Sequence, residues 1–184
     1  MRKYLLIEIG VDKNQLVGDH GASNRRKHSQ MEREGAVLIP LRIPFGDYIK
    51  VNDDIKALID KVGIDKIHKK DLMDLIEVSI DTKKSLVEVC GNVCSRQHER
   101  FREELTKSQG KLILLIEEAN ITELEDVWWW ENPRLKYNPK ATKGTALYKS
   151  LCTIRDEYGV DIRFCDRKVT GKEIIKILEG NDNE

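Results

Sequence analysis

The chain has 184 residues, 40% of them hydrophobic and 35% charged, and its 32 basic and 32 acidic residues cancel. The length fits one domain, and the apolar content excludes a disordered or fibrous chain. Zero net charge excludes a protein that coats nucleic acid non-specifically, since such proteins are basic. A polyanionic partner would therefore have to meet a local patch of basic residues.

The apolar stretches of the chain are short. None approaches the roughly 18 residues that a membrane span requires, so we expect no membrane partner. The apolar start of the chain stops at Glu8, before reaching the h-region of about 7–15 residues found in signal peptides. We expect a cytoplasmic, intracellular protein.

The first half of the chain predicts strands separated by charged segments. The expected strands are Tyr4–Ile9, Ala36–Arg42, Tyr48–Val51 and Glu77–Thr82, the last with alternating apolar and polar residues. The charged segment Asp53–Ile76 predicts two short helices broken near Gly63.

A polar stretch from Asp12 to Glu34 predicts a loop that leads into a short helix around Arg26–Glu34. The basic cluster Arg25–His28 in this stretch allows two interpretations. It is either a mobile phosphate-binding loop or a solvated turn, and the solvated turn is slightly favoured.

The second half predicts longer helices between strands. The expected elements are one long helix from Leu86 to Gly110, a strand at Lys111–Ile116, a helix at Ala141–Tyr158, a strand at Val160–Cys165 and a helix at Thr170–Leu178 with Thr170 as its cap. Strands that alternate with helices predict an α/β fold with a mixed central sheet flanked by helices.

The four cysteines are too few and too scattered for a disulfide framework in a chain of this length. Cys90, Cys94 and His98 fall at helical spacing, which invites a zinc interpretation. Structural zinc sites pair a short knuckle with two further ligands, and no second pair is visible. We therefore expect buried, reduced thiols.

Two neighbouring segments carry opposite charge. Glu117–Glu131 has six acids and no base, and Arg134–Lys149 has five bases and no acid. Charge alone allows two solvated faces or a binding surface. Between them, Trp128–Trp130 cannot all face inward on a helix, so we expect one or two in the core and at least one exposed. The alternative is an interface or a wedge that stacks on DNA bases.

Asp81-Thr82-Lys83 is the segment best suited to chemistry. Residues two apart on a strand point to the same face, so Asp81 and Lys83 project together. A carboxylate can hold a divalent cation while a lysine positions and deprotonates the attacking water in phosphodiester hydrolysis. On spacing alone, a solvated salt-bridged strand would look the same. Asp47 in a Gly-Asp turn and Glu8 are the best further carboxylates.

The order of several motifs resembles a known family. Gly46-Asp47-Tyr48, Ile80–Leu86 and Arg96–Phe101 are similar to the excision-repair (XPF-type) branch of the PD-(D/E)xK nucleases. Small single-domain phage and bacterial members look closer still, through Glu88–Asn92, Asn132–Lys136 and Phe164–Arg167. The likeness covers the chain from about Leu5 to Leu178 apart from the segment 53–76.

The resemblance implies a restriction-endonuclease-like core and a Mg²⁺- or Mn²⁺-dependent DNA endonuclease that prefers branched or flapped DNA. Asp47 and Asp81 would be metal carboxylates, the Thr82 carbonyl a further ligand, Lys83 the catalytic lysine, and Glu8 would complete the shell. For DNA contact we expect basic residues on the helix after Lys83 and in the basic segment, namely Arg96, Arg100, Arg134, Lys136, Lys140 and Lys143. For the first two, pairing with Glu99 or Glu104 is the equally weighted alternative.

The sequence also departs from the family pattern. Asp81 replaces a glutamate, Thr82 an arginine, and Glu8-Ile9-Gly10-Val11 stands where the family commonly has Asp-Thr-Arg-Glu. The alternative function is therefore a catalytically degenerate adaptor that binds DNA or a protein.

We expect a single nuclease domain over 1–180, with a helical insertion at 53–76 and a tail at 181–184. A homodimer would let it reach both DNA strands, inside a bacterial cell or a phage-infected host.

Overall fold

The computed structural model describes residues 3–7, 19–94 and 98–180, so the predictions for Glu8, Arg96 and the tail lie outside the described residues. The chain forms two compact units. An N-terminal unit comprises the residues up to Ile80 and those from Val169 onward, and a central unit comprises Asp81–Lys168. That the two act as one nuclease domain stays a prediction.

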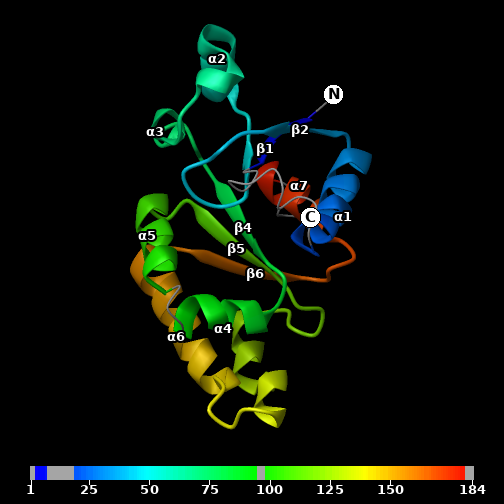
Figure 1. The fold of residues 1–184 in the computed structure, drawn as a ribbon, viewed down its shortest axis with the longest axis vertical. Coiled ribbons are helices and arrows are strands. Elements are labelled where there is room, and N and C mark those ends of the chain that lie inside the picture. Colours follow the sequence, from blue (N-terminus) through cyan, green and yellow to red (C-terminus); the bar gives the residue numbers. More distant parts are fainter. Residues whose placement is uncertain (1–2, 8–18, 95–97, 181–184) are drawn as a thin grey trace. The chain divides into compact units, whose positions relative to one another are not determined.

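The N-terminal unit contains a mixed sheet (Figure 1). Its strands, in spatial order, are β2 (Ala36–Pro40), β1 (Lys3–Ile7), β3 (Tyr48–Lys50) and the first residues of β4 (Ser79–Lys83). β1 runs parallel to β2 and antiparallel to β3, and β3 runs antiparallel to β4. The division between the two units falls within β4, between Ile80 and Asp81.

Helix α1 (Asp19–Arg33) connects β1 to β2 and starts earlier than the sequence predicted. Parallel strands need a crossover connection, and a 15-residue helix supplies it. Its residues are mostly polar, so no apolar periodicity marks its first turns. It packs beside α7 (Thr170–Leu178), where the Gly171 N–H donates to Gln30 Oε1 at 2.7 Å (Figure 1). A Cβ at Gly171 would lie 2.5 Å from the Lys27 carbonyl oxygen, so the two helices approach closely.

The basic cluster Arg25–His28 lies on α1, so both loop interpretations are wrong. Lys27 is only 4% exposed, and its Nζ lies 5.6 Å from the centroid of the Tyr48 ring. His28 Nε2 lies 3.3 Å from the Tyr48 hydroxyl. Burial, and after it the positive charge of Lys27, lowers the pKa of His28 below the ordinary 6.5.

The segment between β3 and β4 contains the two short helices that the sequence predicted. These are α2 (Asp53–Val62) and α3 (Lys69–Leu72), with the short 3₁₀ helix η2 (Ile64–Lys66) between them. Asn52 Oδ1 accepts a hydrogen bond from the Ile55 N–H at 3.0 Å and so caps α2. Gly63, with φ of +81°, ends that helix.

The central unit pairs two parallel strands. Its elements after β4 are α4 (Leu86–Cys94), α5 (His98–Ser108), β5 (Leu112–Glu117), η3 (Leu124–Trp129), η4 (Pro133–Lys136), α6 (Gly144–Tyr158) and β6 (Asp161–Cys165). β5 and β6 pair in the register Ile113 with Asp161 through Glu117 with Cys165. The α/β class and the mixed sheet flanked by helices are confirmed.

One helix boundary differs from the prediction, and another is tested only in part. Of the single helix predicted from Leu86 to Gly110, the structure describes the helical stretches Leu86–Cys94 and His98–Ser108, and residues 95–97 lie outside the described residues. Thr170 does not cap α7. It is the first helical residue and fully buried, and the N-cap is Val169, whose side chain makes no capping hydrogen bond. In the first turn, the Gly171 N–H is instead bonded to the Gln30 side chain of α1.

Each unit has its own apolar interior. The N-terminal unit buries Phe45, Tyr48 and Ile55, and the central unit buries Leu114 and Leu151. Within the described part of the chain, every helix is too short or too polar to cross a bilayer.

The start of α6 packs tightly against η3, which yields a prediction. A Cβ at Gly144 would lie 2.6 Å from the Val127 carbonyl oxygen, a backbone atom that cannot move alone. We expect Gly144→Ala to lower the free energy of unfolding by about 1–3 kcal/mol in urea titrations. Gly91→Ala in α4 is the control, since a Cβ there meets nothing within 4 Å and should add up to about 1 kcal/mol. Equal effects of both substitutions would contradict the close approach.

The lowered pKa of His28 predicts a pH dependence of stability. Below pH 6.5, the unfolded chain binds a proton that the folded chain resists, so stability falls as the pH drops through that value. We expect His28→Gln to flatten the decline of the melting temperature between pH 7.5 and pH 5, measured by circular dichroism. His68→Gln is the control because His68 is exposed. An unchanged slope in the His28 variant would refute the assignment.

Candidate functional site

Strand β4 carries the charged residues that the sequence singled out, and all five of its residues are buried. Asp81 and Lys83 are 4% and 8% exposed, and Lys83 Nζ lies 2.6 Å from Asp81 Oδ2. The predicted projection of both side chains to one face of the strand is therefore present. The solvated salt bridge that was the alternative is not, since the pair is buried.

The groups around Lys83 stabilise the positive charge of its ammonium group. Its Nζ lies 5.3 Å from the centroid of the Phe101 ring on α5, a geometry in which the ring face attracts a cation. Removing two charges from water costs several kcal/mol per ion, and replacing such a pair by apolar residues is often neutral or stabilising. The fold therefore gains little net stability from this pair.

The first residues of β4 fix the turn that carries Asp47. Ser79 Oγ donates to the Phe45 carbonyl at 2.8 Å, and the Asp47 N–H donates to the Ile80 carbonyl at 2.7 Å. Gly46 adopts φ of +71°, which a glycine tolerates without strain. The half-buried Asp47 is thus held by main-chain contacts within the N-terminal unit, whereas Asp81 and Lys83 belong to the central unit.

Glu88 contributes to the start of α4. Its carboxylate accepts a hydrogen bond from the Lys84 N–H at 2.7 Å, and its own N–H lies 3.3 Å from Ser85 Oγ. These contacts satisfy backbone donors that the helix start leaves open. Glu88 therefore has a structural role here.

Glu117 is a buried carboxylate that the sequence reasoning missed. It ends β5, its side chain is 1% exposed, and Arg167 Nε lies 3.8 Å from its Oε2. The sequence feature that could have identified Glu117 is the position of an acid directly after the apolar run Leu112–Ile116. Among the described residues, no three His, Cys, Asp or Glu side chains gather in a ready-made metal cluster.

Two of the three cysteines whose side chains are described are buried as expected, and Cys152 is half-buried. Cys90, Cys152 and Cys165 are free thiols, and Cys90 and Cys165 are buried. Asn132 Nδ2 lies 4.0 Å from Cys90 Sγ, so this thiol belongs to a packed interior.

The predicted DNA-contact residues are exposed wherever the structure describes them. Arg100 lies on α5, Arg134 and Lys136 on η4, and Lys140 and Lys143 in the loop before α6. In the part of the chain that the structure describes, none of the five forms an ion pair with another residue. The pairing of Arg100 with Glu104 that was the alternative is thus not formed.

The three tryptophans are more exposed than predicted. Trp129 is 81% exposed, Trp128 is 37% exposed and Trp130 is half-buried, so none lies in the core. The tight 3₁₀ turn of η3 buries Leu124 and Val127 and leaves the following residues outside. The prediction that at least one is exposed is confirmed.

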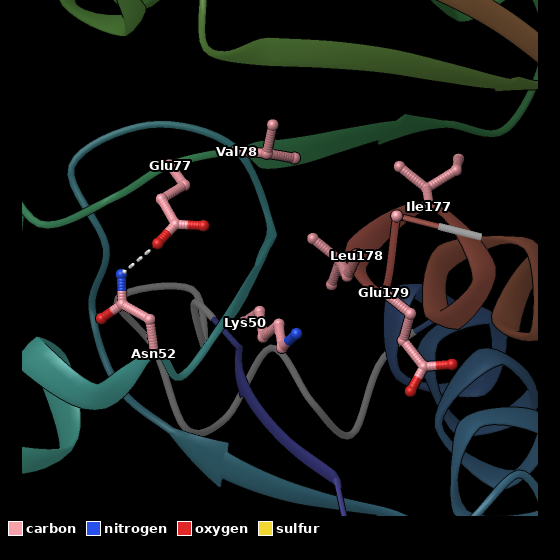
Figure 2. Close-up of a pocket in the computed structure, with 8 residues that line it drawn as sticks. Lys50, Asn52, Glu77, Val78, Ile177, Leu178 and Glu179 are labelled. Atoms are coloured by element: carbon pink, nitrogen blue, oxygen red, sulfur yellow. Dashed lines mark hydrogen bonds between the residues drawn. The ribbon is translucent and has the colours of Figure 1, made fainter. Parts of the chain in front are cut away.

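The N-terminal unit contains a pocket (Figure 2). It is lined by Lys50, Asn52, Glu77, Val78 and residues 177–180 at the end of α7. Asn52 Nδ2 donates to Glu77 Oε1 at 3.1 Å and to the Leu75 carbonyl at 2.8 Å. The amide thus ties two segments of the pocket wall together. None of the predicted catalytic residues lines it.

Comparison with known proteins identifies the fold. No family model and no curated protein matches the chain. Two solved structures of XPF from Aeropyrum pernix, one of them a complex with DNA, match with TM-scores of 0.54 and 0.56 at 14% and 15% identity. The match covers 98% of this chain, which spans 62% and 65% of the length of those two chains. At this identity the likeness shows the fold alone: the chain has an XPF-like nuclease fold.

Proposed function

We propose that the chain is a metal-dependent DNA endonuclease that acts on branched or flapped DNA. The observation that carries this proposal is the buried contact of 2.6 Å between Lys83 and Asp81. A carboxylate and a lysine on one strand face are what the XPF-type pattern requires, and the fold is XPF-like.

The available donors suit a hard divalent cation. Carboxylate and carbonyl oxygens are the ligands that Mg²⁺ and Mn²⁺ prefer, and the proposal assigns this role to Asp47, Asp81 and the Thr82 carbonyl, with Glu8 as a further ligand. A carboxylate offers about four lone-pair sites, so the ammonium at Asp81 Oδ2 does not use up its capacity. When bound, the cation would polarise the phosphodiester and make a water molecule more acidic.

Lys83 has a defined task in this proposal. Its ammonium group, held by Asp81 and by the Phe101 ring, can hold the attacking water and neutralise negative charge that develops on the phosphate. Burial strengthens both effects because little solvent screens the charges. Because these partners already hold the long side chain in one conformation, no further side-chain entropy is lost when the reaction occurs.

The exposed basic residues supply phosphate contacts. Arg134, Lys136, Lys140 and Lys143 lie in a segment without acids, and Arg100 lies on α5. With zero net charge on the chain, binding would depend on this local patch and weaken steeply with salt. In a homodimer, the second copy of the chain would provide a second cleavage site for the other DNA strand. The protein would act inside the cell that contains the branched DNA.

A non-catalytic adaptor is the second candidate. It is favoured by two observations: the exposed Trp129, and the lack of a three-residue metal cluster among the described residues. The two candidates differ in whether the chain cleaves DNA.

Cleavage of a labelled flap or four-way junction with Mg²⁺ tests the proposal. We expect Asp81→Ala, Lys83→Ala and Asp47→Ala each to reduce the cleavage rate by more than about 100-fold while DNA binding is retained. Lys84→Ala and Asp74→Ala should cleave like wild type, since both side chains are exposed and lie outside the proposed site.

Two results would reject the endonuclease. One is no cleavage by the wild-type protein with either Mg²⁺ or Mn²⁺, which favours the adaptor. The other is equal cleavage by the Lys83 and Lys84 variants.

The buried pair also predicts a stability effect that needs no substrate. Lys83→Met leaves the Asp81 carboxylate buried without its ammonium partner, and we expect a loss of about 3–5 kcal/mol in urea unfolding at pH 7. The double variant Asp81→Asn/Lys83→Met should recover most of this loss, because it removes both charges. Lys84→Met is the matched control, and a loss as small as in that control would contradict the buried pair.

Metal binding gives a second readout on the same variants. If Asp81 holds the cation, Mg²⁺ should raise the melting temperature of the wild type, with a stabilisation that grows with the logarithm of the Mg²⁺ concentration above the Kd, and Asp81→Asn should abolish the rise. A rise of equal size in both proteins would remove Asp81 from the proposed metal site.

A further inference from the structure

Two aromatic side chains of the central unit are almost fully exposed. Trp129 is 81% exposed and Tyr137 is 89% exposed, and both lie in the segment between β5 and α6, yellow in Figure 1. Exposed rings of this size demand an explanation when they stand close together in the sequence. By contrast, Trp128 packs edge-on against Tyr148, with ring centroids 5.6 Å apart, and belongs to the body of the unit.

The backbone that carries these rings is well ordered. Buried Asn132 donates from Nδ2 to the Thr142 carbonyl at 2.8 Å and accepts the Arg134 N–H at 3.0 Å. The Tyr137 N–H donates to the Arg134 carbonyl at 3.0 Å, and Asn138 Oδ1 accepts the Lys140 N–H at 3.0 Å. A ligand that stacks on the rings therefore meets a loop that is already folded, which lowers the entropic cost of binding.

The start of the segment is fixed as well. Asp126 Oδ2 accepts hydrogen bonds from the N–H and the hydroxyl of Thr122, both at 2.9 Å, and these bonds lower the pKa of Asp126. η3 packs against α6, where the Cα of Gly144 leaves room for the Val127 carbonyl.

The charges around the rings favour a nucleobase over other ligands. Basic residues follow Trp129 in the sequence without an acid between Asn132 and Lys149, whereas exposed Glu125 and Glu131 flank it. Acids beside Trp129 disfavour a phosphate at that point but not an uncharged base. The described large apolar residues that are exposed are Trp128, Trp129, Tyr137 and Val169, so the rings lack the aliphatic surround typical of the core of a protein interface.

We propose that Trp129 and Tyr137 stack on unpaired bases of single-stranded DNA. The phosphates of that strand would contact the exposed basic side chains of the same segment, which are Arg134, Lys136, Lys140 and Lys143. The inference rests on the proposed function for its choice of DNA, and it names the unpaired strand of a branched substrate as the part that this segment binds. It does not depend on cleavage.

Tryptophan fluorescence tests the site directly, because the three tryptophans of the chain are residues 128–130. An oligodeoxythymidylate of about 16 nucleotides is titrated into the protein in EDTA at low salt. We expect quenching of the emission in the wild type, and most of the quenching lost in Trp129→Phe, whose smaller ring still stacks. A blunt duplex should quench little, since its bases are already stacked on each other.

Affinity measured by anisotropy of a labelled oligonucleotide gives the second readout. Trp129→Ala and Tyr137→Ala should each weaken binding about 5- to 150-fold. Lys140→Gln should weaken it less and reduce its salt dependence. Lys172→Gln, an exposed lysine on α7, is the charge-matched control and should bind like wild type. Melting temperatures of the two alanine variants should match the wild type, because both rings are exposed.

The outcomes separate this inference from the nuclease proposal. The oligonucleotide titration is made in EDTA, so a wild-type protein that binds and quenches but does not cleave with Mg²⁺ or Mn²⁺ would keep the stacking site and lose the endonuclease. Unchanged affinity in both aromatic variants would overturn the inference even if the protein cleaves DNA. So would a wild-type dimer that Trp129→Ala converts to a monomer without any change in DNA binding, which would make the surface a protein interface.

Discussion

The buried contact between Lys83 and Asp81 is the interaction on which the functional interpretation depends. Two opposite charges lie 2.6 Å apart on a strand whose five residues are all buried. Such a pair contributes little net stability, because the cost of removing both charges from water offsets their attraction. The strand could bury apolar residues at lower cost, as β5 does at Leu112–Ile116. This cost of burial is why the proposed nuclease function is built on the charged pair.

Within each unit, a close backbone approach between two elements adds to the packing of the apolar interior. Gly171 allows α7 to contact the polar helix α1, and Gly144 allows α6 to contact η3. With no Cβ in the way, hydrogen bonds such as that from the Gly171 N–H to Gln30 can form between helices.

Local signals in the sequence predicted much of the fold. Glycine positions marked the ends of α2 and α6, at Gly63 and Gly159, and strand alternation placed Asp81 beside Lys83. The features that the sequence did not reveal depend on partners far along the chain. Lys27 is buried with its Nζ 5.6 Å from the centroid of the Tyr48 ring, and α1 meets α7 through a close approach at Gly171 that no apolar periodicity signals. The exposure of Trp129 follows from the tight turn of η3, since apolarity alone favoured burial.

The acid at the end of β5 has a consequence for how the central unit assembles. A strand buried on both faces has no alternation to set its alignment, so β5 could slide along β6 by one residue with little loss of apolar contact. Such a slip would draw the Glu117 carboxylate away from Arg167 and would break the bond from the Glu118 N–H to the Cys165 carbonyl, 3.0 Å long in the native alignment. The contacts of Glu117 and Glu118 thus add a preference for the native alignment at the end of this strand pair.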